Sequence, residues 1–107
     1  MSKDKSIFQL HAEVCKTLAN PKRLEILNLL RDKELNVSDL VNLTGLPKAN
    51  ISQHLAVMRR SGILETRRDG LNIYYRISSS KVTQACELMR EVLLQQISKK
   101  HKILKNT

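Results

Sequence analysis

The 107-residue sequence has few of the residues that build large cores or catalytic loops. It contains no tryptophan, and aromatic residues make up only 3% of the chain. We therefore expect a modest aliphatic core in a single domain spanning residues 1–107. Three glycines leave little room for a phosphate-binding loop, and no Ser, His and acidic grouping is present. These absences argue against an enzyme, and we expect no cofactor.

Long apolar runs and export signals are also absent. No segment approaches the roughly 20 apolar residues that a membrane-spanning helix requires. The segment MSKDKSIFQLHAEV at residues 1–14 lacks the apolar block of a secretory signal. The two cysteines, Cys15 and Cys86, form no CxxC motif. We expect a cytoplasmic protein with reduced thiols at rest.

The charge is strongly positive. Lysine and arginine number 19 against 10 aspartate and glutamate residues, a net charge of +9. Such an excess favours an anionic partner, first nucleic acid and second a membrane surface. The plainer alternative is a charge that serves only solubility, above all in the basic segment 99–107, which we expect to be a mobile tail.

Apolar residues recur at helical spacing in several segments. The expected helices cover residues 3–18, 21–30, 37–43, 47–60 and 80–98. Asn20 and Pro21 begin the second helix, and Gly45 and Gly62 follow the third and fourth. The expected core includes Leu24, Ile26, Leu27, Leu30, Leu40, Val41, Ile51, Leu55 and Met58.

Between the last two helices the apolar period changes from helical to alternating. GILETRR and LNIYYRIS flank Asp69-Gly70, which is typical of a β-hairpin turn. The order is therefore four helices, a hairpin and a final helix. No linker rich in proline or glycine divides it.

The third and fourth helices are joined by the short segment TGLP, which is typical of a helix-turn-helix. In that motif the second helix enters the major groove of DNA, where amides suit adenine and lysine suits guanine. The polar face of segment 47–60 offers these side chains at Lys48, Asn50, Ser52 and Gln53. His54 would contact a base or a phosphate, and Arg59 and Arg60 would contact phosphates.

The hairpin carries a second basic group. Arg67, Arg68 and Arg76 surround its turn, and Tyr74 could donate to a phosphate. The alternative is a solvated ribbon whose arginines only protect its edges. A hairpin directly after a candidate recognition helix favours DNA contact.

Four segments together resemble the ArsR/SmtB family of winged-helix repressors. They are CKTLANPKRLEILNLL, VSDLVNLTGLP, ISQHLAVMRRSGIL and TRRDGLNIYYRI. The resemblance covers about residues 10–98 and implies a mainly α winged helix-turn-helix fold. It also implies a homodimer through helices 1–18 and 79–98, and binding to an inverted-repeat operator in double-stranded DNA. The family's recognition positions correspond to Lys48, Ala49, Asn50, Ser52, Gln53 and His54.

The resemblance further implies an inducer, yet two usual metal sites are missing. The arsenic-sensing type has a Cys-Val-Cys group where this chain has Asn36, Val37 and Ser38. The zinc-sensing type uses Asp and His on the last helix, and SSSKVTQACELMREVLLQQ contains neither.

Cys15 and Cys86 lie on the first and last helices, which pack together in the resembled dimer. One hypothesis is a thiol-based switch responding to oxidants or reactive sulfur. The alternative is a pair of inert apolar side chains. A third possibility is zinc or arsenite held by His11, Cys15 and Cys86, with His101. Regulation without a ligand, a protein-interaction module and a general chromosome-coating protein also stay open.

Overall fold

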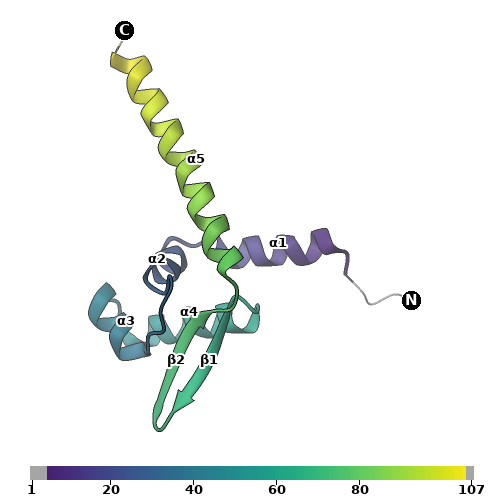
Figure 1. The fold of residues 1–107 in the computed structure, drawn as a ribbon, viewed down its shortest axis with the longest axis vertical. Helices are drawn as coiled ribbons and strands as arrows, with labels where there is room; N and C mark the ends of the chain where they lie inside the picture. Colours follow the sequence, from purple (N-terminus) through teal and green to yellow (C-terminus); the bar gives the residue numbers. More distant parts are fainter. Residues whose placement is uncertain (1–4, 106–107) are drawn as a thin grey trace.

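The computed structural model describes residues 5–105, and it contains five helices and a β-hairpin. Figure 1 shows α5 leaving the body in one direction, the hairpin pointing the opposite way, and α1 extending to one side. The predicted element order and the winged helix-turn-helix fold are confirmed. The elements are α1 (Ile7–Leu18), α2 (Pro21–Leu29), α3 (Val37–Thr44), α4 (Lys48–Arg60), β1 (Leu64–Asp69), β2 (Asn72–Ile77) and α5 (Ser80–Lys105).

The first helix begins later than the predicted residue 3. Ser6 is its N-cap, and the Ser6 hydroxyl accepts a hydrogen bond from the backbone N–H of Gln9 at 3.1 Å. The Gln9 side chain accepts one from the Ser6 N–H at 2.7 Å. This capping box satisfies two N–H groups that the first turn leaves free, so helical geometry starts at Ile7. Residues 3 and 4 lie outside the described residues.

The last helix runs beyond its predicted end at residue 98 and continues to Lys105. Segment 99–105 therefore extends α5, and residues 106–107 of the expected tail lie outside the described residues. At the usual helical rise, the 26 residues of α5 span about 39 Å. Of the helices that the structure describes, none has both the length and the apolar character of a membrane span.

The core lies between α2, α3, α4 and the base of the hairpin. Its fully or nearly fully buried side chains are Ile26, Leu27, Leu30, Leu40, Ile51, Leu55, Met58, Ile63 and Leu64. Among the described residues, no polar or charged residue is buried. The prediction that Leu24 is largely buried is wrong, because this side chain is 41% exposed beside α5.

The hairpin turn lies one residue later than predicted. Asp69 pairs with Asn72 across the strands, so Gly70 and Leu71 form the loop. Gly70 has a φ of +63°, whereas Leu71 does not have a positive φ. Glycine at the first loop position is typical of a type II′ turn, which suits the twist of an antiparallel pair.

The base of the hairpin is tied to the connector between α2 and α3. Leu35 and Tyr75 exchange two backbone hydrogen bonds, of 3.1 and 2.8 Å. Tyr75 and Ile77 also pack against the core. The hairpin is therefore held at a fixed angle to α3 and α4.

The outer helices carry apolar side chains that the described residues leave largely exposed. No residue of α1 is buried, although Val14 and Leu18 pack against the core. On α5, Val82 and Cys86 pack against the core in the same way. The uncovered apolar side chains are Ile7, Phe8 and Leu10 on α1, and Leu88, Met89, Val92, Leu93, Leu94 and Ile97 on α5.

Candidate nucleic-acid interface

Caps hold both ends of α3, and one further hydrogen bond holds the turn that leads into α4. Asn36 caps the start of the helix and shares a capping box with Asp39. Gly45 ends it in the left-handed conformation, with a φ of +73°, where a Cβ would be strained. The Thr44 hydroxyl then accepts from the Leu46 N–H at 3.1 Å. These contacts set the angle at which α4 leaves the turn.

One face of α4 anchors the helix, and the opposite face meets solvent. Ile51, Leu55 and Met58 have no exposed surface. The exposed residues are Lys48, Ala49, Asn50, Ser52, Gln53, Arg59 and Arg60. No acidic residue lies between Asp39 and Glu65, so α4 carries no negative side chain. The exposed face offers amides, a hydroxyl and cations, the groups that bind base edges and phosphates.

His54 lies at the edge of this face and is half-buried. Its Nδ1 accepts a hydrogen bond from Nε of Arg23 on α2, at 3.2 Å. The same guanidinium donates through Nη1 to the Thr17 carbonyl of α1, at 3.1 Å. Burial, and then the positive charge of Arg23, lower the pKa of His54 below its usual value, so its neutral form is favoured.

On the hairpin, Arg67 is engaged with neighbouring side chains. Its Nε lies 3.2 and 3.1 Å from the two carboxylate oxygens of Glu34, and Nη1 lies 3.9 Å from Asp69. Its guanidinium also lies 4.9 Å from the centre of the Tyr74 ring. The side-chain hydrogen bond and charge of Glu34 raise the pKa of Arg67. Arg67 therefore joins the hairpin to the connector before α3.

The other two arginines of the hairpin differ from each other. Arg76 donates to Glu65 across the strands at 2.7 Å, so a carboxylate balances its charge. Arg68 is exposed, and among residues 5–105 it forms no ion pair with another side chain. Of the three, Arg68 is the cation most available to an external anion.

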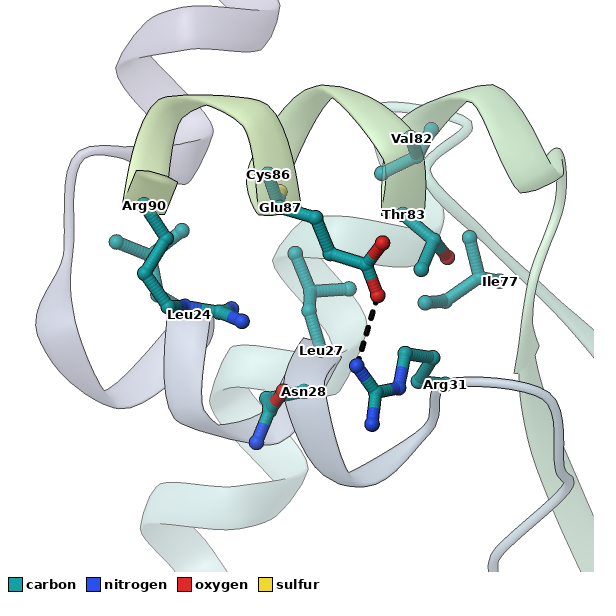
Figure 2. A pocket seen from close by; sticks show the side chains of 10 residues that line it. All are labelled: Leu24, Leu27, Asn28, Arg31, Ile77, Val82, Thr83, Cys86, Glu87 and Arg90. Carbon is teal, nitrogen blue, oxygen red and sulfur yellow. Dashed lines mark hydrogen bonds and ion pairs between the residues drawn. The ribbon is translucent and has the colours of Figure 1, made fainter. Parts of the chain in front are cut away.

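The two thiols lie in different environments. Cys15 is exposed on α1, whereas Cys86 is half-buried on α5. Cys86 lines a narrow pocket between α2 and α5, together with Leu24, Leu27 and Arg90 (Figure 2). Burial raises the pKa of Cys86, and Arg90 opposes this shift. Cys86 thus remains mostly a thiol at neutral pH.

The predicted metal alternative finds no support within one chain. In the part of the chain that the structure describes, no three His, Cys, Asp or Glu side chains group as metal ligands. His11, Cys15, Cys86 and His101 therefore do not form a metal site within a single chain.

Three contacts of this region were not predicted. Arg23 contacts His54 across 31 positions, Glu34 contacts Arg67 across 33 positions, and Leu35 pairs with Tyr75. Glu34 and Leu35 belong to the charged segment RDKELN, which has no strand-like period. Local pattern carries no signal for such pairs, because they depend on how α2 packs against α4 and the hairpin.

Comparisons with known proteins agree with this geometry. The sequence profile described as "Bacterial regulatory protein, arsR family" matches residues 20–66, from the cap of α2 into β1. The uncharacterized HTH-type transcriptional regulator Rv0081 of Mycobacterium tuberculosis is 36% identical over 101 residues, 94% of this chain and 89% of that protein. Its crystal structure aligns with a TM-score of 0.80 over 91% of this chain and 98% of that chain.

Two further relatives match over most of their length. The transcriptional repressor PagR of Bacillus anthracis is 42% identical over 82 residues, 76% of this chain and 82% of PagR. A homodimeric winged helix-turn-helix DNA-binding domain from Mycobacterium bovis, a possible ArsR-family regulator, aligns with a TM-score of 0.75 and 32% identity. That alignment covers 87% of this chain and 90% of that chain. Profile, relatives and fold agree, and the chain belongs to the arsR family of bacterial transcriptional regulators.

Proposed function

We propose that this regulator represses transcription by binding an inverted-repeat operator as a homodimer, and that a thiol-based signal releases it. The observation that carries the proposal is the exposed face of α4, which has no acidic residue, together with the largely exposed apolar faces of α1 and α5. The face of α4 can bind base edges and phosphates, and the apolar faces of α1 and α5 can pair two copies of the chain.

The side chains proposed to contact DNA fall into two groups, those that recognise bases and those that bind phosphates. Asn50, Ser52 and Gln53 present the hydrogen-bonding groups that recognise base edges. Lys48 and Ala49 stand at the start of the helix, where lysine suits guanine and a methyl group suits thymine. Phosphate contacts are assigned to Arg59 and Arg60 at the other end of α4, and to Arg68 and Tyr74 on the hairpin. In this proposal Arg67 holds the hairpin in place and does not contact a phosphate.

Pairing of two copies is supported by the exposed apolar side chains. Phe8 is 79% exposed and Ile97 is 63% exposed, and similar residues follow both helices. A patch of this kind on a small protein usually marks an interface. The homodimeric relative from Mycobacterium bovis supports a second copy as the partner. Two-fold pairing would separate the two α4 helices by about one turn of DNA, roughly 34 Å.

Sedimentation velocity at micromolar concentration tests the dimer. The wild type is expected to sediment as a dimer, and Leu93→Glu as a monomer, because a charge would enter the apolar interface. Leu71→Glu is the matched control, since it adds the same charge to a leucine that is 98% exposed at the hairpin tip. A monomeric wild type, or a dimeric Leu93→Glu variant, would contradict the proposed interface.

Binding to DNA upstream of the protein's own gene tests operator recognition. Fluorescence anisotropy should show binding that excess unrelated DNA does not abolish, and that weakens when five base pairs are inserted between the half-sites. The insertion turns one half-site to the opposite side of the duplex. Equal affinity for all duplexes would instead indicate a chromosome-coating protein.

The thiol part of the proposal is supported by where the cysteines lie. Both are on helices with uncovered apolar faces, and Cys15 is exposed to a reagent. Because Cys15 is exposed and Cys86 is half-buried, Cys15 is expected to react first and Cys86 second. A peroxide would take two electrons from the two thiols, giving a disulfide and water. The bond requires Cα atoms within about 7 Å, within one chain or across the dimer.

Operator binding before and after treatment with a persulfide donor or peroxide tests this signal. The wild type should release the operator, and Cys15→Ser or Cys86→Ser should prevent release. Unchanged operator binding of the treated wild type would exclude the thiol signal, and it would not contradict the proposed DNA binding. Arsenite and zinc would then be titrated, because ligands from two chains could still combine.

A further inference from the structure

Arg23 connects three helices through one side chain. It stands in the first turn of α2, where its backbone N–H donates to the Asn20 cap at 3.2 Å. Its guanidinium reaches the Thr17 carbonyl at the end of α1 and Nδ1 of His54 in the middle of α4. One planar group thus joins an outer helix to the helix that faces DNA.

The contact with His54 determines which ring nitrogen carries the proton. An arginine guanidinium has five donor hydrogens and no acceptor. Nδ1 of His54 must therefore be the unprotonated nitrogen, and in the neutral ring the hydrogen is on Nε2. The lowered pKa of His54 is consistent with this neutral form. Because Nδ1 already accepts a hydrogen bond from Arg23, the ring can form one more hydrogen bond, as a donor through Nε2–H.

We propose that Arg23 is a positioning residue for DNA recognition, which holds His54 as the Nε2–H tautomer so that it donates to an acceptor on DNA. The inference rests on the proposed DNA-facing role of α4. The acceptor is a phosphate oxygen or an acceptor on a base edge, such as guanine O6 or N7. The exocyclic amino groups of adenine and cytosine are donors, so His54 does not bind them.

Lysine cannot replace arginine in this arrangement. The two bonds leave from different nitrogens of a rigid group, Nε toward His54 and Nη1 toward Thr17. A lysine has a single nitrogen on a flexible chain and lacks the planar geometry that serves both acceptors. Arg23→Lys therefore preserves the charge and removes the positioning.

The tautomer can be measured without DNA. Long-range ¹H–¹⁵N spectra of the wild-type protein at pH 8 should show His54 with Nε2 protonated and Nδ1 bare. In Arg23→Lys the two tautomers should mix. Arg31→Lys is the matched control, since Arg31 also lies by α2 but pairs with Glu87 at 2.7 Å. A protonated Nδ1 in the wild type, or an unchanged tautomer in Arg23→Lys, would overturn the inference.

Operator binding gives the second readout. A hydrogen bond to a charged phosphate typically changes affinity by about tenfold or more, and one to a neutral base acceptor by about two- to tenfold. His54→Ala should therefore weaken binding by at least about twofold for each half-site. Arg23→Lys should weaken it as well, and the double variant should bind no more weakly than His54→Ala alone. Additive losses, or no loss for His54→Ala, would refute positioning through His54.

The pattern across operator variants identifies the acceptor. An even loss over all base substitutions in His54→Ala indicates a phosphate, and a changed preference at one base pair indicates a base edge. A wild type that binds no DNA would refute the proposed function itself. The tautomer measured in the free protein would separate that outcome from a failure of the positioning.

Discussion

Arg67 and Arg68 are adjacent in the hairpin, yet their contacts predict different effects of substitution on the salt dependence of DNA binding. Each phosphate contact contributes about 0.9 to the slope of log affinity against log salt concentration. A dimer carries two copies of Arg68, so Arg68→Gln should flatten that slope by about 1.8. Between 50 and 200 mM salt, the wild type would then lose roughly twelvefold more affinity than the variant.

Arg67→Gln should leave the slope unchanged, because Glu34 and Asp69 already balance the charge of Arg67. The Arg67 side chain is 47% exposed, so solvent screens its ion pair with Glu34 and the pair contributes little to stability. Loss of this anchor should weaken binding much less than loss of a phosphate contact, and the salt slope should keep its wild-type value.

Anisotropy titrations of both variants at four or more salt concentrations measure the slope and the affinity separately. Equal slopes for the two variants would refute the reasoning. A flattened slope in Arg67→Gln would mean that Arg67 leaves Glu34 for a phosphate when DNA binds. A wild-type slope in Arg68→Gln would mean that Arg68 does not contact a phosphate.

Three further predictions concern the exposed face of α4, the buried core and His54. Gln53→Ala should cost about 1–3 kcal/mol of binding for each half-site and relax the preference at one base pair of that half-site. Asn28→Ala, which removes an exposed amide on α2, should do neither, and anisotropy against operator variants measures both. Leu55→Ala should lower the free energy of unfolding by about 2–5 kcal/mol in urea, because Leu55 has no exposed surface, whereas Leu71→Ala should change it by less than about 0.5 kcal/mol. The unfolded chain protonates His54 more readily than the folded one, since folding lowers its pKa from 6.5. The free energy of unfolding should therefore fall as the pH drops below 6.5, and His54→Gln should lack this component in urea titrations across pH.

Elements that depend on local chemistry were predictable from the sequence. Ile51, Leu55 and Met58 recur at helical spacing, and all three are fully buried. Gly45 ends α3 in the left-handed conformation that the prediction requires. The capping box at Ser6 and Gln9 also carries a local signal, and it would have placed the start of α1 correctly.

Other features depend on packing between distant segments. The end of α5 is an exception, because the absence of proline and glycine after residue 98 is a local signal that the helix continues. Leu24 fits the helical apolar pattern but lies at the edge of the core, where α5 covers it only in part. The roles of Arg23 and Glu34 depend on partners more than 30 positions away. No periodic pattern identifies such partners.

The long, largely uncovered α5 has a consequence for how the regulator responds to its own abundance. In the proposed dimer, only a second copy buries the exposed apolar face of α5, so folding and association are linked in one equilibrium. The midpoint of thermal unfolding should then rise with protein concentration. Below the dissociation constant of the dimer, the species that can occupy both half-sites increases with the square of the chain concentration. Halving the number of chains in a cell would lower the dimer concentration about fourfold. Operator occupancy would therefore depend more steeply on protein concentration than it would for a monomeric DNA-binding protein.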